Sequence, residues 1–448
     1  MAKHVLRTTA LDILVRVGEQ GGFSHLLIDQ AIKKKGLANN DEALLTEIVY
    51  GTLQRKLTLE YYLVNFIDPK KKITPWVKWL LYMSIYQLTF LDRIPDHAVL
   101  NESVEVAKIR GHKGIASFVN GVLRNVQRKG LPDTSKIKDT TERISVETSH
   151  PVWLVKRWMD MYGPTVTEDM CRENLTHKPM TVRVQPLKIS RDAAIEKLQD
   201  EGYEVEKSIF SSQGIIINKG NILRSELFKE GALTVQDQSS MLVAEMLDLT
   251  QGMTVLDACS APGGKTTHIA EKMEDKGEVF AYDLHDKKAK LVSRKAQELD
   301  LNVITAKQAD SRQLHTLHEQ ESFDRILIDA PCSGLGVLRG KPDIKYQKTT
   351  QDIQDLSVIQ LELLESISSL LKKDGKLLYS TCTVDKLEND IVVEKFLATH
   401  KQFEVDQTFF EELPSSLQQS QGRSNYGLQL FPQDYHTDGF FLTRFKRK

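Results

Sequence analysis

The sequence has 448 residues, of which 40% are hydrophobic and 27% are charged, a composition typical of globular proteins rather than of disordered chains. This length exceeds one ordinary domain and predicts about three. The sequence has no run of 18 apolar residues, and charges interrupt the apolar positions near the N-terminus. These features argue against a membrane span or a signal peptide and predict a cytoplasmic protein.

The net charge of −1 hides an uneven distribution of charge along the chain. Residues 1–130 hold 19 Lys and Arg against 12 Asp and Glu, a balance of +7, so the remainder carries −8. A basic N-terminal third favours an anionic partner, of which nucleic acid is the commonest in the cytoplasm. A solvated helical surface would carry the same charges, so charge alone leaves both interpretations open.

The first two-thirds of the chain divide into a helical region, a linker and a mixed region. Apolar spacing from Arg7 to about Lys129 is helical throughout, which predicts an all-helical domain over residues 1–130. The polar stretch Gly130–Arg143 contains Gly and Pro and is interpreted as a linker. Residues 145–245 begin with helical spacing and then alternate, turn helical and alternate again, which predicts a small α+β module.

From residue 246 to residue 448 short apolar runs alternate with helical stretches. The runs are "MTVLDAC", "EVFAYDL", "NVITAKQAD", "DRILIDAP", "KLLYSTC" and "FEVDQ". Strands that alternate with helices predict a doubly wound, parallel α/β sheet. The final segment, "LQLFPQDYHTDGFFLTRFKRK", is expected to close the domain as a β-hairpin. The sequence therefore predicts a multidomain protein that ends in an α/β domain.

The four cysteines are Cys171, Cys259, Cys332 and Cys382, and none forms a C-x-x-C pair or lies at zinc-finger spacing from a histidine. This spacing argues against a disulfide framework, and no metal site is expected. Cys332 follows a proline in a glycine-bearing loop, and Cys382 lies between two threonines at the end of an apolar run. Cys259 is expected in a pocket wall, and Cys171 in a helical core.

The first apolar run of the α/β domain leads into "DACSAPGGKTTH", where Ser260, Ala261, Gly263 and Gly264 would let a ligand approach the backbone before a helix begins. This stretch is neither G-x-G-x-x-G nor a P-loop, since the first glycine of the P-loop is missing. A tight turn that needs glycine would explain the same residues.

Acidic residues end four successive predicted strands, namely Asp257, Asp283, Asp310 and Asp329. Each alone is more often a helix cap or a solvated strand end. Because ligands of doubly wound sheets bind at the carboxyl ends of the strands, the four together predict a pocket for a nucleoside. Acids would repel a phosphate, whereas S-adenosylmethionine carries a ribose, an ammonium and a sulfonium. We therefore expect S-adenosylmethionine as the cofactor.

Cys332 and Cys382 follow the fourth and fifth predicted strands, which are neighbours in the usual strand order. A methyl donor beside two thiols suggests methylation of cytosine. A thiolate that adds to carbon 6 makes carbon 5 nucleophilic, and a second group then assists release. Asp329 would hydrogen-bond the cytosine edge near nitrogen 3. These residues alone do not say which cysteine has which role.

Four motifs, "DACSAPGGKTTH", "DAPCSGLGVLRGKPDIKY", "YSTCTVDKLEND" and "TDGFFLTR", closely resemble RNA cytosine-5 methyltransferases. The N-terminal third resembles a NusB-like RNA-binding domain in "RTTALDILVRV", "YGTLQRKLTLEYYL", "IPDHAVLNESVEVAK" and "FVNGVLRNVQRK". Together they resemble the RsmB/Sun family, bacterial methyltransferases of a cytosine in 16S ribosomal RNA. The resemblance covers nearly the whole chain and implies ribosomal RNA, or a small-subunit assembly intermediate, as the partner of a protein expected to be a monomer.

The resemblance also assigns roles to residues. It implies that Cys382 is the nucleophile, that Cys332 assists release and that Asp329 belongs to the catalytic set. It implies cofactor contacts from Cys259, Ser260, Ala261, Pro262, Gly263, Gly264, Lys265, Asp283, Asp310 and Asp329. One departure from the family concerns RNA contact by the module, because Arg183 is followed by Gln185 where the family usually has asparagine in an R-x-N pattern.

Two alternatives remain at this stage. A non-catalytic RNA-binding assembly factor with an inactive methyltransferase fold would be favoured by loss of either cysteine, but both are present. A DNA methyltransferase would use the cysteine after proline as its nucleophile, and the second cysteine and the basic helical domain argue against it. Tritiated methyl incorporation into RNA or into DNA would distinguish these alternatives.

Overall fold

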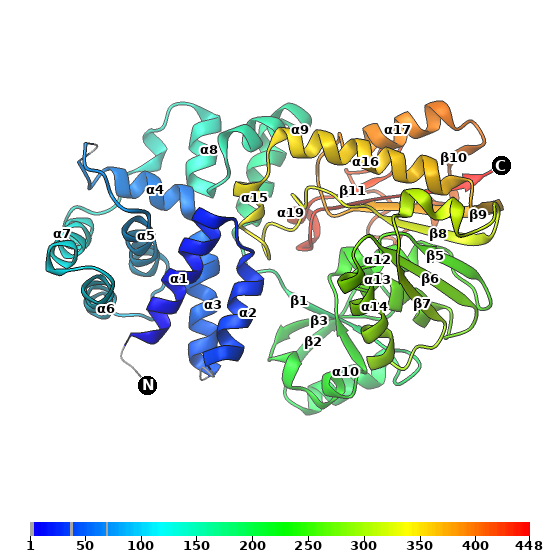
Figure 1. The fold of residues 1–448 in the computed structure, drawn as a ribbon, viewed down its shortest axis with the longest axis horizontal. Coiled ribbons are helices and arrows are strands. Elements are labelled where there is room, and N and C mark those ends of the chain that lie inside the picture. The colour runs from blue at the N-terminus through cyan, green and yellow to red at the C-terminus, as the bar shows by residue number, and fades with distance from the viewer. Residues whose placement is uncertain (1–3, 36–38, 69) are drawn as a thin grey trace. The chain divides into compact units, whose positions relative to one another are not determined.

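The computed structural model describes residues 4–35, 39–68 and 70–448, and the chain forms two compact units (Figure 1). The helical unit runs to Thr176 and also includes Leu338–Gln347. The sheet unit comprises His177–Val337 and Lys348–Lys448. The sequence analysis assigned residues from 145 onward to the module, whereas helices up to Glu173 belong to the compact helical unit.

The helical unit contains the elements α1 (Val5–Gln20), α2 (Ser24–Lys35), α3 (Asn39–Gln54), α4 (Lys56–Val64), α5 (Pro75–Phe90), α6 (Asp96–Arg110), α7 (Lys113–Lys129), η1 (Thr134–Lys136), α8 (Thr140–Thr148), α9 (Val152–Glu173) and α15 (Ile344–Gln347). α5 is buried at Val77 and from Trp79 to Gln87, and α1, α3, α4, α6 and α7 pack against it. α9 is interrupted at Gly163 because Pro164 lacks a backbone N–H. The predicted all-helical domain is confirmed.

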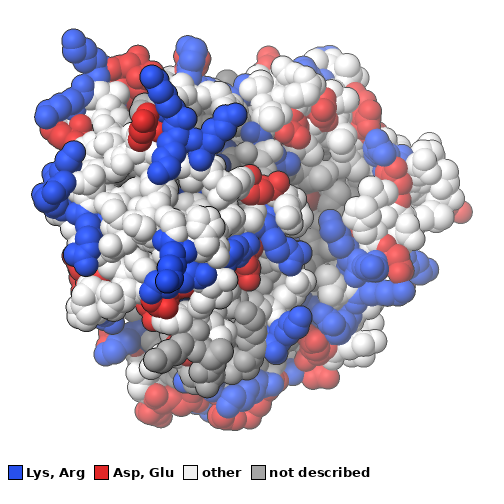
Figure 2. Space-filling model, turned by 60° about the vertical axis from the view of Figure 1, so that its left-hand side comes forward, with Lys and Arg blue, Asp and Glu red and all other residues white. Residues whose placement is uncertain are grey.

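α7 has two chemically distinct faces. Its buried face consists of Ala116, Val119, Val122, Leu123 and Val126. Its exposed side chains include Lys113, Arg124, Arg128 and Lys129, and the helix contains no acidic residue. Figure 2 shows basic side chains spread over one face of the molecule, with fewer acidic side chains between them. α7 therefore exposes cations and no acid.

The segment Leu338–Gln347 lies in the helical unit, although it sits between two parts of the sheet unit in sequence. Ser24 donates a hydrogen bond to Asp343 over 2.6 Å, and Tyr346 Oη donates to the carbonyl of Ser149 over 3.0 Å. Lys345 is fully buried and donates to the side chain of Gln54 over 2.8 Å. Burial holds the pKa of Lys345 well below its usual range. The helical unit therefore closes around a strap supplied by a distant part of the chain.

The predicted α+β module is a four-stranded antiparallel sheet in the order β2-β3-β1-β4. Its elements are β1 (Met180–Val184), α10 (Arg191–Asp200), β2 (Glu204–Lys207), β3 (Gly214–Lys219), η2 (Ile222–Arg224), α11 (Glu226–Lys229) and β4 (Leu233–Val235). A separate small core, which includes Val182, Leu198 and Ile215, packs α10 against this sheet. The alternation seen in the sequence was thus interpreted correctly.

The second sheet has eight strands, and its main path runs β10-β12-β9-β8-β5-β6-β7 with β11 paired to β12. Its strands are β5 (Thr254–Asp257), β6 (Glu278–Asp283), β7 (Ile304–Gln308), β8 (Phe323–Asp329), β9 (Leu371–Thr381), β10 (Phe403–Val405), β11 (Leu428–Leu430) and β12 (Phe440–Arg447). β5 to β9 pair in parallel, whereas β12 is antiparallel to β9, β10 and β11. The expected α/β fold is confirmed, with an antiparallel edge that includes the predicted hairpin.

Helices cover both faces of this sheet. Figure 1 shows α16 and α17 on one face and α12, α13 and α14 on the other. The helices and turns are α12 (Gln238–Glu245), α13 (Gly264–Lys272), α14 (Asp286–Glu298), η3 (Ser311–Thr316), α16 (Thr350–Ser368), α17 (Asp390–Thr399), α18 (Thr408–Glu412) and α19 (Pro432–Tyr435). Strand order reverses between β5 and β8, so ligand binding is expected at the carboxyl ends of these strands. Within the described residues, none of the helices has the length and apolar character that crossing a membrane requires.

Candidate active site

The loop between β5 and α13 carries the residues Cys259 to Lys265. Ser260 is held by two hydrogen bonds to the carbonyl of Tyr282, one from its backbone N–H over 2.8 Å and one from its hydroxyl over 2.9 Å. Gly263 has a φ of +101°, and a Cβ there would lie 3.2 Å from the Cα of Val292. Both conditions favour glycine, so the backbone of this loop passes closely over α14.

Lys265 and Asp329 form an ion pair within the site. Lys265 Nζ donates to Asp329 Oδ2 over 2.7 Å, and the hydroxyl of Ser380 donates to Asp329 Oδ1 over 2.8 Å. Burial disfavours the charged lysine, but the charge and hydrogen bond of Asp329 outweigh this effect and raise the pKa of Lys265. Since Asp329 pairs in register with Ser380, the β8–β9 ladder itself positions the carboxylate.

Cys332 and Cys382 lie with their Sγ atoms 3.3 Å apart and are not joined by a disulfide. Ser333, beside Cys332, donates its N–H to Glu388 over 2.8 Å, and its hydroxyl lies 2.9 Å from that of Thr383. The hydrogen bond with Cys382 and burial together raise the pKa of Cys332 well above its usual range. The structure therefore brings together two cysteines that are fifty positions apart in sequence.

Close backbone packing holds the loops of the two cysteines together. Gly336 donates its N–H to the carbonyl of Cys382 over 3.0 Å, and Gly439 donates to the carbonyl of Gly336 over 2.8 Å. A Cβ on Gly336 would lie 1.9 Å from the carbonyl oxygen of Gly439. A side chain at position 336 would therefore push the cysteine loops apart.

A cavity of about 280 Å³, here called the cysteine cavity, lies at the carboxyl ends of β5, β8 and β9. It collects many of the residues predicted from the sequence, namely Asp257, Cys259, Ser260, Ala261, Pro262, Gly264, Lys265, Asp329 and Cys382. Cys332 does not line it but lies next to Cys382. Cys171, in contrast, is fully buried in α9, as expected for a core residue.

Asp283 and Asp310 end β6 and β7 and do not line the cysteine cavity. Asp283 accepts the N–H of His285 over 3.0 Å. Asp310 accepts two side-chain hydrogen bonds from Arg312, over 3.1 and 2.8 Å, and these lower its pKa. Both carboxylates lie at the same sheet edge as the cavity, because β5, β6 and β7 are parallel neighbours.

The sequence analysis missed several residues that line the cysteine cavity. They are Val235, Gln236, Asp237, Ser239, Ser240, Lys295, Val337, Asp438 and Phe440. Lys178 links the carboxylates of Asp237 and Asp438. Burial opposes ionisation of Asp237, but the charge of Lys178 prevails and lowers its pKa to about 2. Asp237 is also the N-cap of α12, because its side chain accepts a hydrogen bond from Ser239 N–H.

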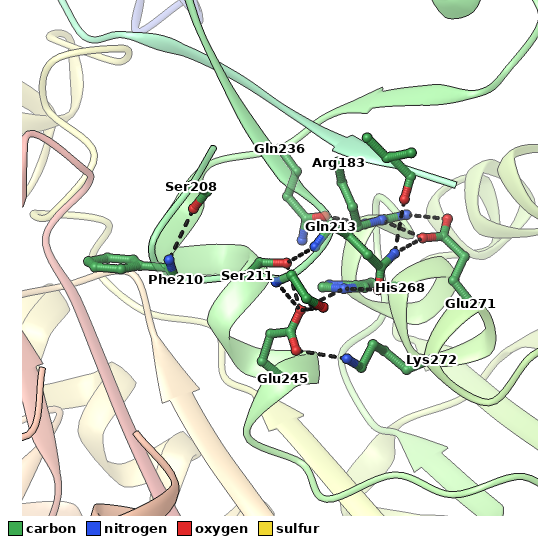
Figure 3. A network of polar contacts seen from close by, with 12 residues as sticks. Arg183, Ser208, Phe210, Ser211, Gln213, Gln236, Glu245, His268, Glu271 and Lys272 are labelled. Carbon is green, nitrogen blue, oxygen red and sulfur yellow. Dashed lines mark hydrogen bonds and ion pairs between the residues drawn. The ribbon is translucent and has the colours of Figure 1, made fainter. Parts of the chain in front are cut away.

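Arg183 lies at the centre of a buried polar network (Figure 3) and not on an exposed surface. Its guanidinium donates to both oxygens of Glu271 over 2.7 Å each, to the hydroxyl of Thr267 over 3.0 Å and to the carbonyl of Gly264 over 2.8 Å. Gln185 is also buried, and its amide is 3.4 Å from the carbonyl of Leu299. Neither side chain is therefore exposed at the surface of the sheet unit.

The same network joins the module to α13. Gln213, which directly precedes β3, donates to Glu271 over 2.9 Å and lies 3.2 Å from His268 Nε2. Burial, reinforced by the charges of Arg183 and Lys272, holds the pKa of His268 well below its usual range. Gln236, which lines the cysteine cavity, accepts a hydrogen bond from Arg183. The module thus holds the helix that begins at Gly264.

Three family models match successive parts of the chain. Residues 4–128 match the NusB family, residues 150–223 match the ferredoxin-like domain of RsmF/B-like methyltransferases, and residues 244–446 match the 16S rRNA methyltransferase RsmB/F.

Curated relatives are similar over their full length. "Probable ribosomal RNA small subunit methyltransferase B" of Bacillus subtilis (strain 168) is 46% identical, with 100% of both chains covered. The protein of the same name from Synechocystis sp. is 33% identical over 98% of this chain and 99% of its own. The crystal structure of PH0851 shares 26% identity and a TM-score of 0.82, with 99% of this chain and 98% of that one covered. NSun6 from Pyrococcus horikoshii, solved with SFG, shares the fold at 21% identity and a TM-score of 0.60, covering 66% of this chain and 98% of its own.

Proposed function

Because this chain belongs to the RsmB/Sun family of small-subunit ribosomal RNA methyltransferases, we propose that it methylates carbon 5 of a cytosine in 16S ribosomal RNA through a covalent cysteine adduct. The observation that carries this proposal is the pair of thiols 3.3 Å apart, one of which lines a cavity with Lys265 and Asp329. Carbon 5 of cytosine needs covalent activation, and a thiolate can supply it.

The cavity has features that suit S-adenosylmethionine, which supplies an electrophilic methyl group when bound. A Cβ on Gly264 would meet only Lys295 Nζ, at 3.9 Å, so the backbone is open to a ligand there. Asp257 Oδ1 is buried, and no described residue forms a hydrogen bond with it, so it is suited to receive a donor. We assign Cys259 to Lys265 and Asp329 to cofactor binding, with Asp283 accepting from the ribose hydroxyls and Asp310 contributing at the next strand end.

The residues of the chain then account for each step on cytosine. The Cys382 thiol loses its proton, and the thiolate adds to carbon 6. Asp329, held by Lys265 and Ser380, orients the base through its nitrogen 3 edge. Carbon 5 then bonds to the methyl carbon of the cofactor as the methyl–sulfur bond breaks, and the sulfur keeps that electron pair as a thioether. Water takes the carbon 5 proton, the electron pair of that C–H bond forms the carbon 5–carbon 6 double bond, and the Cys382 thiolate leaves, a step that Cys332 assists. The base must leave its stack to reach this cavity.

We propose a division of labour along the chain. Residues 1–130 and the module at 145–245 position RNA, and residues 246–448 catalyse transfer. The exposed face of α7 carries cations and no acid, which supports phosphate binding by residues 1–130. Its substrate is ribosomal RNA or a small-subunit assembly intermediate. The protein acts in the cytoplasm, as a monomer.

Two single-cysteine variants test the mechanism. Cys382→Ala should be inactive and form no covalent complex, because no thiolate can add to carbon 6. In Cys332→Ala the Cys382 thiolate should still add to carbon 6, and carbon 5 should still accept the methyl group. The RNA should then fail to be released, leaving a protein–RNA adduct that survives denaturing electrophoresis. The assay uses unmodified 16S ribosomal RNA and tritiated S-adenosylmethionine, with Cys171→Ala, a cysteine in the helical core, as the control.

The distribution of the adduct distinguishes the alternatives. An adduct with Cys382→Ala, and none with Cys332→Ala, would reverse the two roles, as in DNA methyltransferases. Methylation that persists in both variants without any adduct would disprove the covalent mechanism.

The cofactor assignment has its own test. Asp283→Ala should weaken S-adenosylmethionine binding by about 1–3 kcal/mol, because ribose hydroxyls would lose their acceptor. Calorimetry measures this directly, with Asp286→Ala as a control at an exposed acid on the same connection. Equal affinities for wild type and Asp283→Ala would remove Asp283 from the site.

A further inference from the structure

Lys295, on α14, is a half-buried cation that forms no ion pair within the described part of the chain. Among the residues that the structure describes, its Nζ makes no hydrogen bond and no ion pair. Lys290, on the same helix, instead lies in solvent and pairs with Asp286 over 2.7 Å. Desolvating an ammonium is costly unless a partner compensates for it, so Lys295 is suited to receive an anion.

Neighbouring charges do not supply that partner. Glu271 is held by both of its oxygens to Arg183. Glu298, one turn further along α14, lies 3.6 Å from Arg294. Arg183 itself repels Lys295, whereas both acids attract it only at longer range. The positive charge of Lys295 is therefore available to a ligand.

Lys295 stands where two cavities join. A cavity of about 570 Å³, here called the α14 groove, lies between α14 and the module and includes Phe228, Leu233 and Leu291 in its walls. It shares Val235, Pro262 and Lys295 with the cysteine cavity. Its ionic lining consists of the cations Lys229, Arg294 and Lys295 and the acids Glu230 and Glu298. The groove thus continues from the cysteine cavity and has one more cation than acid.

We propose that the α14 groove holds the RNA strand next to the target cytidine and that Lys295 binds a phosphate of that strand. This inference rests on the proposed function, since it needs the target base in the cysteine cavity. A flipped nucleotide remains joined to its neighbours through phosphates, which must then lie at the mouth of that cavity. The apolar walls suit an unstacked neighbouring base, and the unpaired ammonium suits the phosphate between them.

The cofactor carboxylate is a less suitable occupant of the same site. The α14 groove runs beside the last turns of α14, from Leu291 to Leu299, whereas Asp283 precedes the first turn of that helix. A single small carboxylate would also leave most of a 570 Å³ groove without a ligand. A phosphodiester strand uses both the charge and the apolar walls.

The test compares Lys295→Gln with Lys290→Gln, the matched control on the same helix. Binding of unmodified, in vitro transcribed 16S ribosomal RNA is measured without cofactor over a range of salt concentrations. Lys295→Gln should bind RNA about tenfold more weakly at low salt, with the log–log salt slope reduced by about 1, because one phosphate is no longer neutralised. Lys290→Gln should match wild type, and Lys295→Arg should retain binding. S-adenosylmethionine affinity should be unchanged in all three.

Two outcomes would overturn the proposal. One is an RNA affinity and salt slope for Lys295→Gln equal to those of Lys290→Gln. The other is a loss of S-adenosylmethionine affinity with RNA binding intact, which would make Lys295 a cofactor contact. RNA binding is measured separately from methyl transfer. Failure of the wild-type protein to methylate cytosine would therefore refute the proposed function, whereas the salt slope would still show whether Lys295 binds a phosphate of the RNA.

The pH dependence of binding offers a second readout. Burial, together with the charge of Arg183 on β1, lowers the pKa of Lys295 to about 8. The other charged groups around it are Glu271 on α13, Arg294 and Glu298 on α14, and Lys229 and Glu230 at the end of α11. RNA affinity should therefore fall as pH rises through about 8 in wild type and stay level in Lys295→Arg. Parallel pH profiles for the two proteins would contradict phosphate binding by Lys295.

Discussion

The carboxyl group of Asp257 is fully buried at the end of β5. Its Oδ2 accepts a hydrogen bond from Thr266 over 2.6 Å, while Oδ1 has no partner among the described residues. Burial, with a further contribution from the charge of Asp329, raises the pKa of Asp257 to about 7. Such an acid costs stability when it ionises, so its position at the cavity suggests selection for ligand binding rather than for stability.

The raised pKa predicts a specific pH dependence of stability. The unfolded chain releases this proton near pH 4 but the folded chain only near pH 7, so wild type should lose stability as pH rises between these values. Asp257→Asn carries no charge and should lack that loss. Between pH 5 and pH 8 the variant should therefore gain about 2–3 kcal/mol of unfolding free energy relative to wild type.

Urea unfolding followed by circular dichroism at the two pH values measures this difference. All four tryptophans (Trp76, Trp79, Trp153 and Trp158) lie in the helical unit, so their fluorescence reports that unit separately. A constant difference between variant and wild type across this pH range would show that Asp257 is already ionised at pH 5 in the folded protein.

At the scale of elements, the module is attached to the start of α13 by the Arg183 network. Arg183 comes from β1, whereas its acceptors Glu271 and Gly264 come from α13, more than eighty positions later. Gly264 is the first residue of α13, the helix that follows the proposed cofactor loop. By holding Gly264, the network therefore also fixes the position of that loop. The module therefore has a structural role in addition to any contact with RNA.

Removing Arg183 should destabilise the sheet unit and loosen the cofactor loop. Arg183→Gln leaves Glu271 buried without its cation and should cost about 3–5 kcal/mol of unfolding free energy. S-adenosylmethionine affinity should fall as well, and both losses should shrink in the double variant Arg183→Gln/Glu271→Gln. Urea unfolding and calorimetry measure the two effects.

An exposed ion pair in the same module provides the control. Lys219→Gln breaks a pair with Glu204 at the surface and should leave stability and cofactor affinity unchanged. If Arg183→Gln behaved like Lys219→Gln, the buried network would have no positioning role.

At the scale of the whole molecule, the chain passes from the sheet unit into the helical unit and back through Leu338–Gln347. This strap begins six residues after Cys332 and contributes the buried Lys345 and Tyr346 to the helical unit. Deletion of residues 1–130 would remove the partners of that strap, such as Gln54 and Ser24. Substitutions on the surface of α7 are therefore a cleaner test of RNA binding than truncation.

Neutralising the basic face of α7 should weaken RNA binding, because fewer phosphates would be neutralised by the protein. The variant with Lys113, Arg124, Arg128 and Lys129 all replaced by Gln removes four exposed cations from a helix without acids. Its log–log salt slope for 16S ribosomal RNA should be lower by about 1 for each phosphate that these side chains bind in wild type. Filter binding at several salt concentrations measures this slope.

The matched control replaces the four lysines Lys276, Lys290, Lys372 and Lys448 with Gln, since each pairs with an acid and none lies in the regions proposed to position RNA. The control should retain the wild-type slope. Equal slopes for the α7 variant and the control would place RNA binding elsewhere.

The sequence by itself determined the types of element and the residues at strand ends. Helical and strand periodicities are local, so the helices of residues 7–129 and the strands from β5 to β10 could be read directly. Parallel strands end at one edge of a sheet, which is why Asp329, Cys332 and Cys382 could be expected near one another.

Only the tertiary structure decided which distant groups meet. Ser24 and Asp343 are 319 positions apart, and Arg183 and Glu271 are 88 positions apart, so no local sequence pattern predicts either contact. In the sequence, Arg183 stood out only as part of a departure from the family's R-x-N pattern, and Lys295 was not singled out at all. The packing of α13, α14 and the module buries Arg183 against Glu271. The same packing places Lys295 between two cavities. Desolvation and pairing of charges are properties of the folded chain, and they give these residues their roles.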